Sequence, residues 1–109
     1  MQQLTRGERE ALCILYEAAT YETRAFETMM ACAKMMQDSD MSRTYAEQME
    51  AAATRAFFMK LCITLDDEKI VTLARQLVSV FTKTCSMQAV LDWVHENDEE
   101  IQTWKARFR

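Results

Sequence analysis

The chain contains no proline and only one glycine, Gly7, among its 109 residues. Tight β-hairpins depend on glycine, proline and Asn-Gly turns, so a sheet would have almost no residues with which to build its turns. Half of the residues are hydrophobic and 28% are charged, which suits a packed domain rather than a disordered chain. The composition therefore predicts one all-α domain covering residues 1–109, near the commonest domain size.

Signals for membranes, secretion and nucleic acids are also missing. No apolar run approaches the roughly 20 residues that span a bilayer, and the N-terminus lacks the basic-then-apolar pattern of a signal segment. The four cysteines are far apart and form no CxxC pair. The formal net charge of −4 provides no basic excess for nucleic acid. We expect a cytoplasmic protein with reduced thiols, no membrane partner and no nucleic-acid partner.

Catalytic equipment is equally scarce. His95 is the only histidine, it falls on the polar face of its helix, and no glutamate stands three residues before it. Di-iron bundles and His-based triads therefore lack their residues, and one glycine cannot form a phosphate-binding loop. Cys13 lies on a more polar face and is the thiol expected to react first, whereas three cysteines lie in or beside apolar stripes: Cys32, Cys62 and Cys85. We expect no enzymatic activity, no cofactor and no bound metal.

Helical periodicity and capping residues predict four main helices. Thr5 and Glu8 fit a capping box at the start of the first helix, and Ser86 is the expected N-cap of the fourth. The expected ranges are about 5–37, 41–63, 66–84 and 87–107. Asn97 and Asp98 interrupt the apolar side of the last range. We expect one continuous or slightly kinked helix there; the alternative is a break, with Asn97 and Glu100 capping a short fifth helix.

The turns between these helices are short, so sequential helices should be antiparallel and form a four-helix up-down bundle. The first helix has a wider apolar arc than a surface helix needs. Its two neighbouring stripes are Leu12, Leu15, Ala19, Phe26, Met30 and Ala33, and Ala11, Ile14, Ala18, Tyr21, Ala25, Met29, Cys32 and Met36. A dimer of helical hairpins is therefore the main alternative, and the sequence leaves open whether one chain or two cover this arc.

Two features invite a functional interpretation. Glu22 points into the apolar arc, so it needs a partner such as Arg55 or a tyrosine hydroxyl, or its pKa must rise. A structural ion pair or a partly exposed position at the rim is the simpler interpretation, and Asp98 raises the same question. The methionine cluster between Met29 and Met41 is more unusual, because methionine fills irregular gaps and also builds adaptable binding surfaces.

By elimination, the sequence predicts a small protein-interaction module, such as an adaptor, inhibitor or chaperone-like regulator. Its partner would be another protein or a second copy of itself. The residues expected to contact the partner are Met29, Met35, Met36, Phe57, Phe58 and Leu61. Two alternatives stay open: a ligand or metal carrier, since thioethers and Cys32 suit a soft ion such as Cu(I), and a nucleic-acid regulator using the basic-aromatic tail, Trp104–Arg109.

Overall fold

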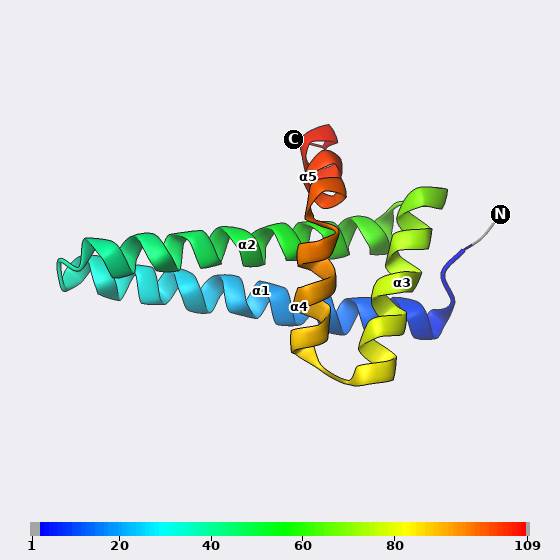
Figure 1. The fold of residues 1–109 in the computed structure, drawn as a ribbon, viewed down its shortest axis with the longest axis horizontal. Helices are drawn as coiled ribbons and strands as arrows, with labels where there is room; N and C mark the ends of the chain where they lie inside the picture. Colours follow the sequence, from blue (N-terminus) through cyan, green and yellow to red (C-terminus); the bar gives the residue numbers. More distant parts are fainter. Residues whose placement is uncertain (1–2, 109) are drawn as a thin grey trace.

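The computed structural model describes residues 3–108, and within that range it contains five helices and no strand (Figure 1). The helices are α1 (Arg6–Met35), α2 (Ser39–Thr64), α3 (Glu68–Thr84), α4 (Met87–Glu96) and α5 (Asp98–Arg107). The prediction of an all-α fold is therefore confirmed. Arg109, the end of the predicted basic tail, lies outside the described residues.

Helices α1 and α2 form a long antiparallel hairpin (Figure 1). The turn lies two residues earlier than the sequence suggested, because α1 ends at Met35 and α2 already begins at Ser39. Gln37 makes the reversal with a left-handed φ of 60°, and Asp38 caps α2 by accepting a hydrogen bond from the Met41 amide. Since the chain has no glycine here, a glutamine takes the left-handed conformation instead.

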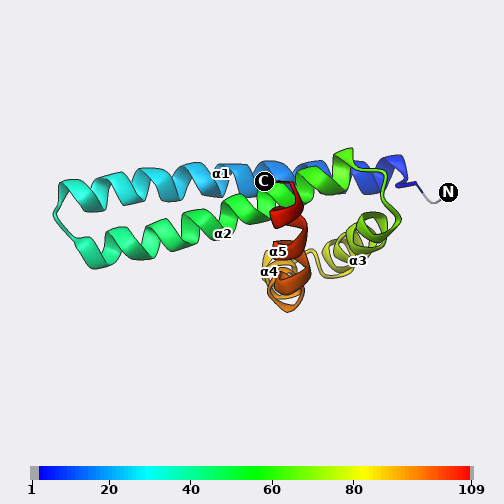
Figure 2. The ribbon, with the colours of Figure 1, turned by 90° about the horizontal axis from the view of Figure 1, so that it is seen from above.

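The remaining helices do not complete an up-down bundle. They cross one end of the hairpin instead of running alongside it, and all three lie on the same side of it (Figures 1 and 2). Length is one reason: α3 has 17 residues and α4 has 10, against 30 in α1. The distribution of buried residues is another, because α1 buries four residues before position 20 and only Ala33 after it. The structure therefore does not confirm the predicted bundle.

The final helical region breaks at Asn97, so the expectation of one continuous or slightly kinked helix is wrong, and the alternative of a break followed by a short fifth helix is confirmed. Only the capping expected of Asn97 is wrong, because its side chain makes no capping hydrogen bond to α5. Its Nδ2 instead donates to the carbonyl oxygen of Trp93 at 2.8 Å, which satisfies this half-buried amide group. The break lets Trp93 of α4 and Ile101 and Trp104 of α5 all enter the core.

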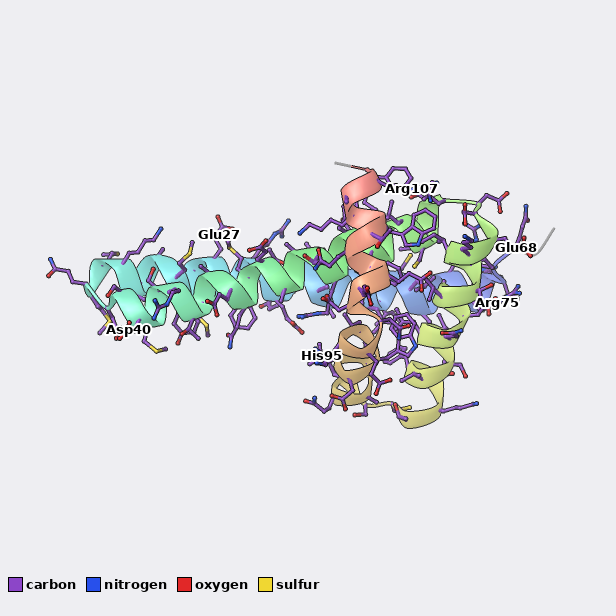
Figure 3. All side chains as sticks on the ribbon, turned by 45° about the horizontal axis from the view of Figure 1, so that its top comes forward. Glu27, Asp40, Glu68, Arg75, His95 and Arg107 are labelled. Atoms are coloured by element: carbon purple, nitrogen blue, oxygen red, sulfur yellow. The ribbon has the colours of Figure 1, made fainter. Side chains whose placement is uncertain are left out.

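One hydrophobic core connects all five helices, and it lies where α3–α5 cross the hairpin. Its largest fully buried members are Leu12, Leu15, Phe58, Met59, Cys62, Ile70, Leu77, Val90 and Ile101. Residues 24–46, which include the hairpin turn, contribute none of the core residues. We call this segment the arm; Figure 3 shows its side chains standing clear of α3–α5, with Glu27 and Asp40 marking it.

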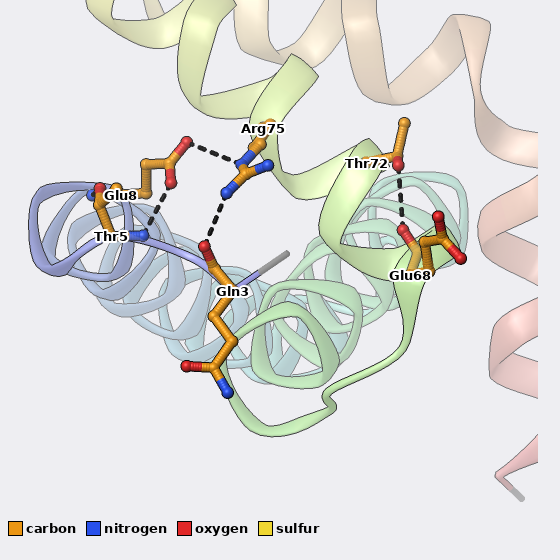
Figure 4. A network of polar contacts seen from close by, with 6 residues as sticks. All are labelled: Gln3, Thr5, Glu8, Glu68, Thr72 and Arg75. Carbon is orange, nitrogen blue, oxygen red and sulfur yellow. Dashed lines mark hydrogen bonds and ion pairs between the residues drawn. The ribbon is translucent and has the colours of Figure 1, made fainter. Parts of the chain in front are cut away.

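A polar cluster fastens the start of α1 to α3 (Figure 4). The predicted capping box is present: the Thr5 amide donates to Glu8 Oε1 at 2.8 Å, and the Glu8 amide donates to Thr5 Oγ1 at 3.2 Å. Arg75 of α3 lies 3.4 Å from Glu8 Oε2 and donates to the Gln3 carbonyl oxygen at 2.6 Å. The hydrogen bond from Thr5, together with Arg75, lowers the pKa of Glu8 below its usual value.

Candidate protein-interaction surface

Large apolar side chains remain exposed, and half of them belong to α1, with Met36 directly after its end. Ile14 is 56% exposed and Tyr21 77%, while Met35 and Met36 reach 85% and 80%. Met29 is also exposed. These residues lie beside the stripe that packs against α2, so the wide apolar arc of α1 is only partly covered within the chain.

The far end of the arm contains an apolar groove of about 300 Å³ between α1 and α2. It is lined by Thr28, Met29, Cys32, Ala33, Met36, Asp38, Met41 and Tyr45. The Tyr45 ring stacks on Phe26 with 6.5 Å between ring centroids, which gives one end of the groove an aromatic base. We call this site the methionine groove. It combines the Tyr45 ring with methionine side chains, which are flexible and adapt to apolar partners.

The six residues predicted to contact a partner separate into two groups. Met29, Met35 and Met36 lie together at the end of the arm and are exposed. The second group lies at the opposite end of the hairpin, beneath α3–α5.

Phe58 and Leu61 belong to the core in this structure, and Phe57 is half-buried at its edge. The sequence left open whether the rest of the fold or a partner covers this end of α2, and here the fold covers it. Phe58 packs against Trp93, with 6.1 Å between ring centroids. The contact surface must therefore be sought at the methionines, and contact with a partner stays a prediction.

The ion pair predicted for Glu22 is present. Arg55 Nη2 of α2 donates to Glu22 Oε2 of α1, and the Arg55 side chain is largely buried. This pair joins the two helices near the base of the arm. Asp98, in contrast, is exposed and accepts a hydrogen bond from Gln102 at 3.4 Å, so it needs no buried partner.

A second, more polar cleft of about 430 Å³ lies between α2 and the α4–α5 pair. It is lined by Glu47, Glu50, Ala51, Thr54, Arg55, Leu91, Val94, His95, Asp98 and Gln102. Sequence reasoning missed this cleft, because its residues come from three helices and no local pattern links them. Within residues 3–108, no three His, Cys, Asp or Glu side chains gather closely enough to hold a metal ion.

The cysteines differ strongly in their surroundings. All four cysteines are free thiols; Cys13, Cys32 and Cys85 are exposed, whereas Cys62 is buried in the core. Burial raises the pKa of Cys62 to about 12, because the thiolate would lose its hydration. Cys13 has the exposure expected of the first thiol to react, and Cys32 lies in the methionine groove.

The basic-aromatic tail folds back on itself. Phe108 stacks on Trp104, and the Arg107 guanidinium lies 4.8 Å from the Trp104 ring centroid. Lys105 Nζ donates to the buried Thr54 hydroxyl at 3.0 Å. The Lys105 contact joins α5 to α2, whereas Arg107 and Phe108 pack on Trp104 within the tail itself.

In the part of the chain that the structure describes, no helix is both long enough and apolar enough to span a membrane. Comparison with known proteins identifies no matching family, no similar curated protein and no similar solved structure.

Proposed function

We propose that this chain is a small protein-interaction module that binds the apolar side of a partner protein's helix in the methionine groove. The observation that carries the proposal is the exposure of Met29, Met35 and Met36 at the end of an arm that takes no part in the core. Isolated exposed apolar residues are common, but a contiguous apolar groove on a soluble fold is typical of an interaction site.

The arm is suited to this role because it can change without unfolding the rest of the protein. Its residues contribute nothing to the hydrophobic core, so movements or substitutions there leave the packing of α3–α5 intact. A helix laid in the groove would cover the methionine thioethers and the Tyr45 ring. Full burial of one such side chain contributes about 1.5–3 kcal/mol to the free energy of binding, so two buried methionines would strengthen binding measurably.

The proposal involves no catalytic step and no cofactor. It includes a cytoplasmic setting, since the exposed thiols of Cys13, Cys32 and Cys85 would stay reduced there. The carrier and nucleic-acid alternatives have less support. The core is filled with side chains, and the tail residues Lys105 and Arg107 are already engaged within the fold.

Site-specific crosslinking, followed by direct binding, tests the proposal. A photo-crosslinking amino acid is placed at Met36 in the groove or, as the matched control, at Met87, an exposed methionine at the start of α4. A protein that crosslinks from position 36 and not from position 87 is then purified. Its affinity is measured for the wild type, M29K/M36K and M87K.

We expect M29K/M36K to lower the affinity by at least about ten-fold, because two charged groups would have to be desolvated in the groove. M87K should bind like the wild type. Equal crosslinking from both positions, or unchanged affinity of M29K/M36K, would contradict the proposal. Helicity should be unchanged in both variants, since all three methionines are exposed.

A further inference from the structure

A seven-residue repeat runs along the exposed flank of α1, beside the methionine groove. One row consists of Ala11, Ala18, Ala25 and Cys32, and the row next to it consists of Ile14, Tyr21, Thr28 and Met35. Spacings of three and four residues that alternate in this way are typical of a seam between two helices. We call these two rows the α1 seam.

No helix of the described chain covers the outer row of this seam. Ile14, Tyr21 and Met35 are exposed, while Ala18 and Ala25 are half-buried beside them. The stripe that meets α2 is a different one, shifted around the helix to Leu12, Ala19 and Phe26 by the helical period. Ala11, at one end of the seam, is buried in the core. From Ile14 onward, the outer row of the seam is an apolar helix face that no helix among residues 3–108 covers.

We infer that this seam pairs with the same seam of a second copy of the chain, in antiparallel orientation. In the inferred register, Tyr21 faces Ala18 of the partner subunit and Ile14 faces Ala25 of the partner subunit. Two-fold symmetry repeats both contacts, so each large side chain meets an alanine. The paired region covers residues 7–32, about 39 Å of helix at 1.5 Å per residue.

Charge complementarity selects this register. Glu17 and Arg24 border the seam on its outer edge, both are exposed, and neither forms an ion pair among residues 3–108. In the inferred register, Glu17 lies opposite Arg24 of the partner subunit, and the symmetry forms this ion pair twice. In antiparallel helix pairs, edge charges of this kind set the register and the orientation.

The competing arrangements bring like charges together. Sliding one copy by seven residues places either Arg24 against Arg24 of the partner subunit or Glu17 against Glu17 of the partner subunit. A parallel pair places Glu17 beside Glu22 of the partner subunit. The antiparallel arrangement also separates the two sets of α3–α5, because each set packs near the N-terminal half of its own α1.

The α1 seam and the methionine groove adjoin at Thr28 and Cys32, which belong to the seam and also line the groove. The two associations are nevertheless tested through different side chains. Glu17 and Arg24 do not line the groove, and the inferred seam contacts do not include Met36 or Met41. Loss of one association therefore does not imply loss of the other.

Light scattering coupled to size-exclusion chromatography tests the inference, with the mass measured at two protein concentrations. The variants are Glu17→Arg, Arg24→Glu and the charge-swapped E17R/R24E. E27R is the matched control, since Glu27 is an exposed glutamate on the far side of α1. Circular dichroism verifies that each variant keeps its helicity.

We expect the wild type and E27R to have twice the 12.7 kDa mass of one chain. Each single reversal should raise the dissociation constant about ten-fold or more, because it replaces two ion pairs by two like-charged contacts. E17R/R24E should restore the wild-type constant. A monomeric wild type, single reversals without effect, or a swap that fails to restore the dimer would overturn the inference.

M29K/M36K separates the two hypotheses. It should lose the partner of the methionine groove while keeping the mass of the dimer, and E17R should do the opposite.

Discussion

Replacing Phe58 by alanine should destabilise the protein severely, although the sequence offered this residue as a contact for a partner. Its side chain is 1% exposed and lies against Trp93 of α4. Phe→Ala substitutions at such sites cost about 3–5 kcal/mol, because apolar contacts are lost and a cavity remains. Domains of this size are stable by only about 5–15 kcal/mol in total.

The measurement is urea unfolding followed by circular dichroism, with thermal unfolding alongside. A loss of about 3 kcal/mol corresponds to a melting temperature lowered by at least about 10 °C in a domain near 100 residues. Phe57→Ala is the matched control, because the neighbouring ring is only half-buried and should lose clearly less stability. A loss below about 1 kcal/mol for Phe58→Ala would refute the reasoning, since α3–α5 would then not cover this ring.

Three further predictions concern single groups. Cys62 should react with a thiol reagent only as fast as the protein unfolds, whereas Cys13 should react at once; rapid modification of Cys62 in the folded protein would contradict its burial. The lowered pKa of Glu8 stabilises the fold above the ordinary carboxyl pKa, and this contribution is lost as the pH falls through the folded value. E8Q should therefore flatten the pH dependence of unfolding between about pH 5 and 3, and an unchanged profile would argue against the contacts of Glu8. Glu22 and Arg55 should show a coupling free energy of about 0.5–1 kcal/mol in a double-mutant cycle of E22Q and R55M, and additive effects would mean that the ion pair contributes nothing measurable.

Local sequence rules predicted the helices well because the responsible interactions are short-range. The capping box at Thr5 and Glu8, and the cap at Ser86, involve residues three positions apart, and both are present. The Glu22–Arg55 pair was also found, since a carboxylate pointing into an apolar arc requires a partner. The break at Asn97 was harder to predict. A polar residue on the apolar side of a helix is compatible with a break in the helix and equally with a continuous helix in which the buried amide is hydrogen-bonded.

The candidate site was only partly accessible to sequence reasoning. The methionines stood out by composition, and the structure places Met29, Met35 and Met36 at the exposed end of the arm. Phe58 and Leu61 have the same apolar character in the sequence, yet they are buried. Hydrophobic pattern shows that a side chain avoids water, but it does not show whether its own chain or another one covers it.

The sequence by itself thus determined the all-α class, the approximate bounds of the helices and the unusually wide apolar arc of α1. Tertiary structure alone decided that α3–α5 cross one end of the hairpin, that the arm projects beyond them, and that the polar cleft around His95 exists. The physical reason is the range of the interactions. Helical propensity and capping act within one turn, whereas the crossing of helices depends on contacts between residues such as Phe58 and Trp93, far apart along the chain.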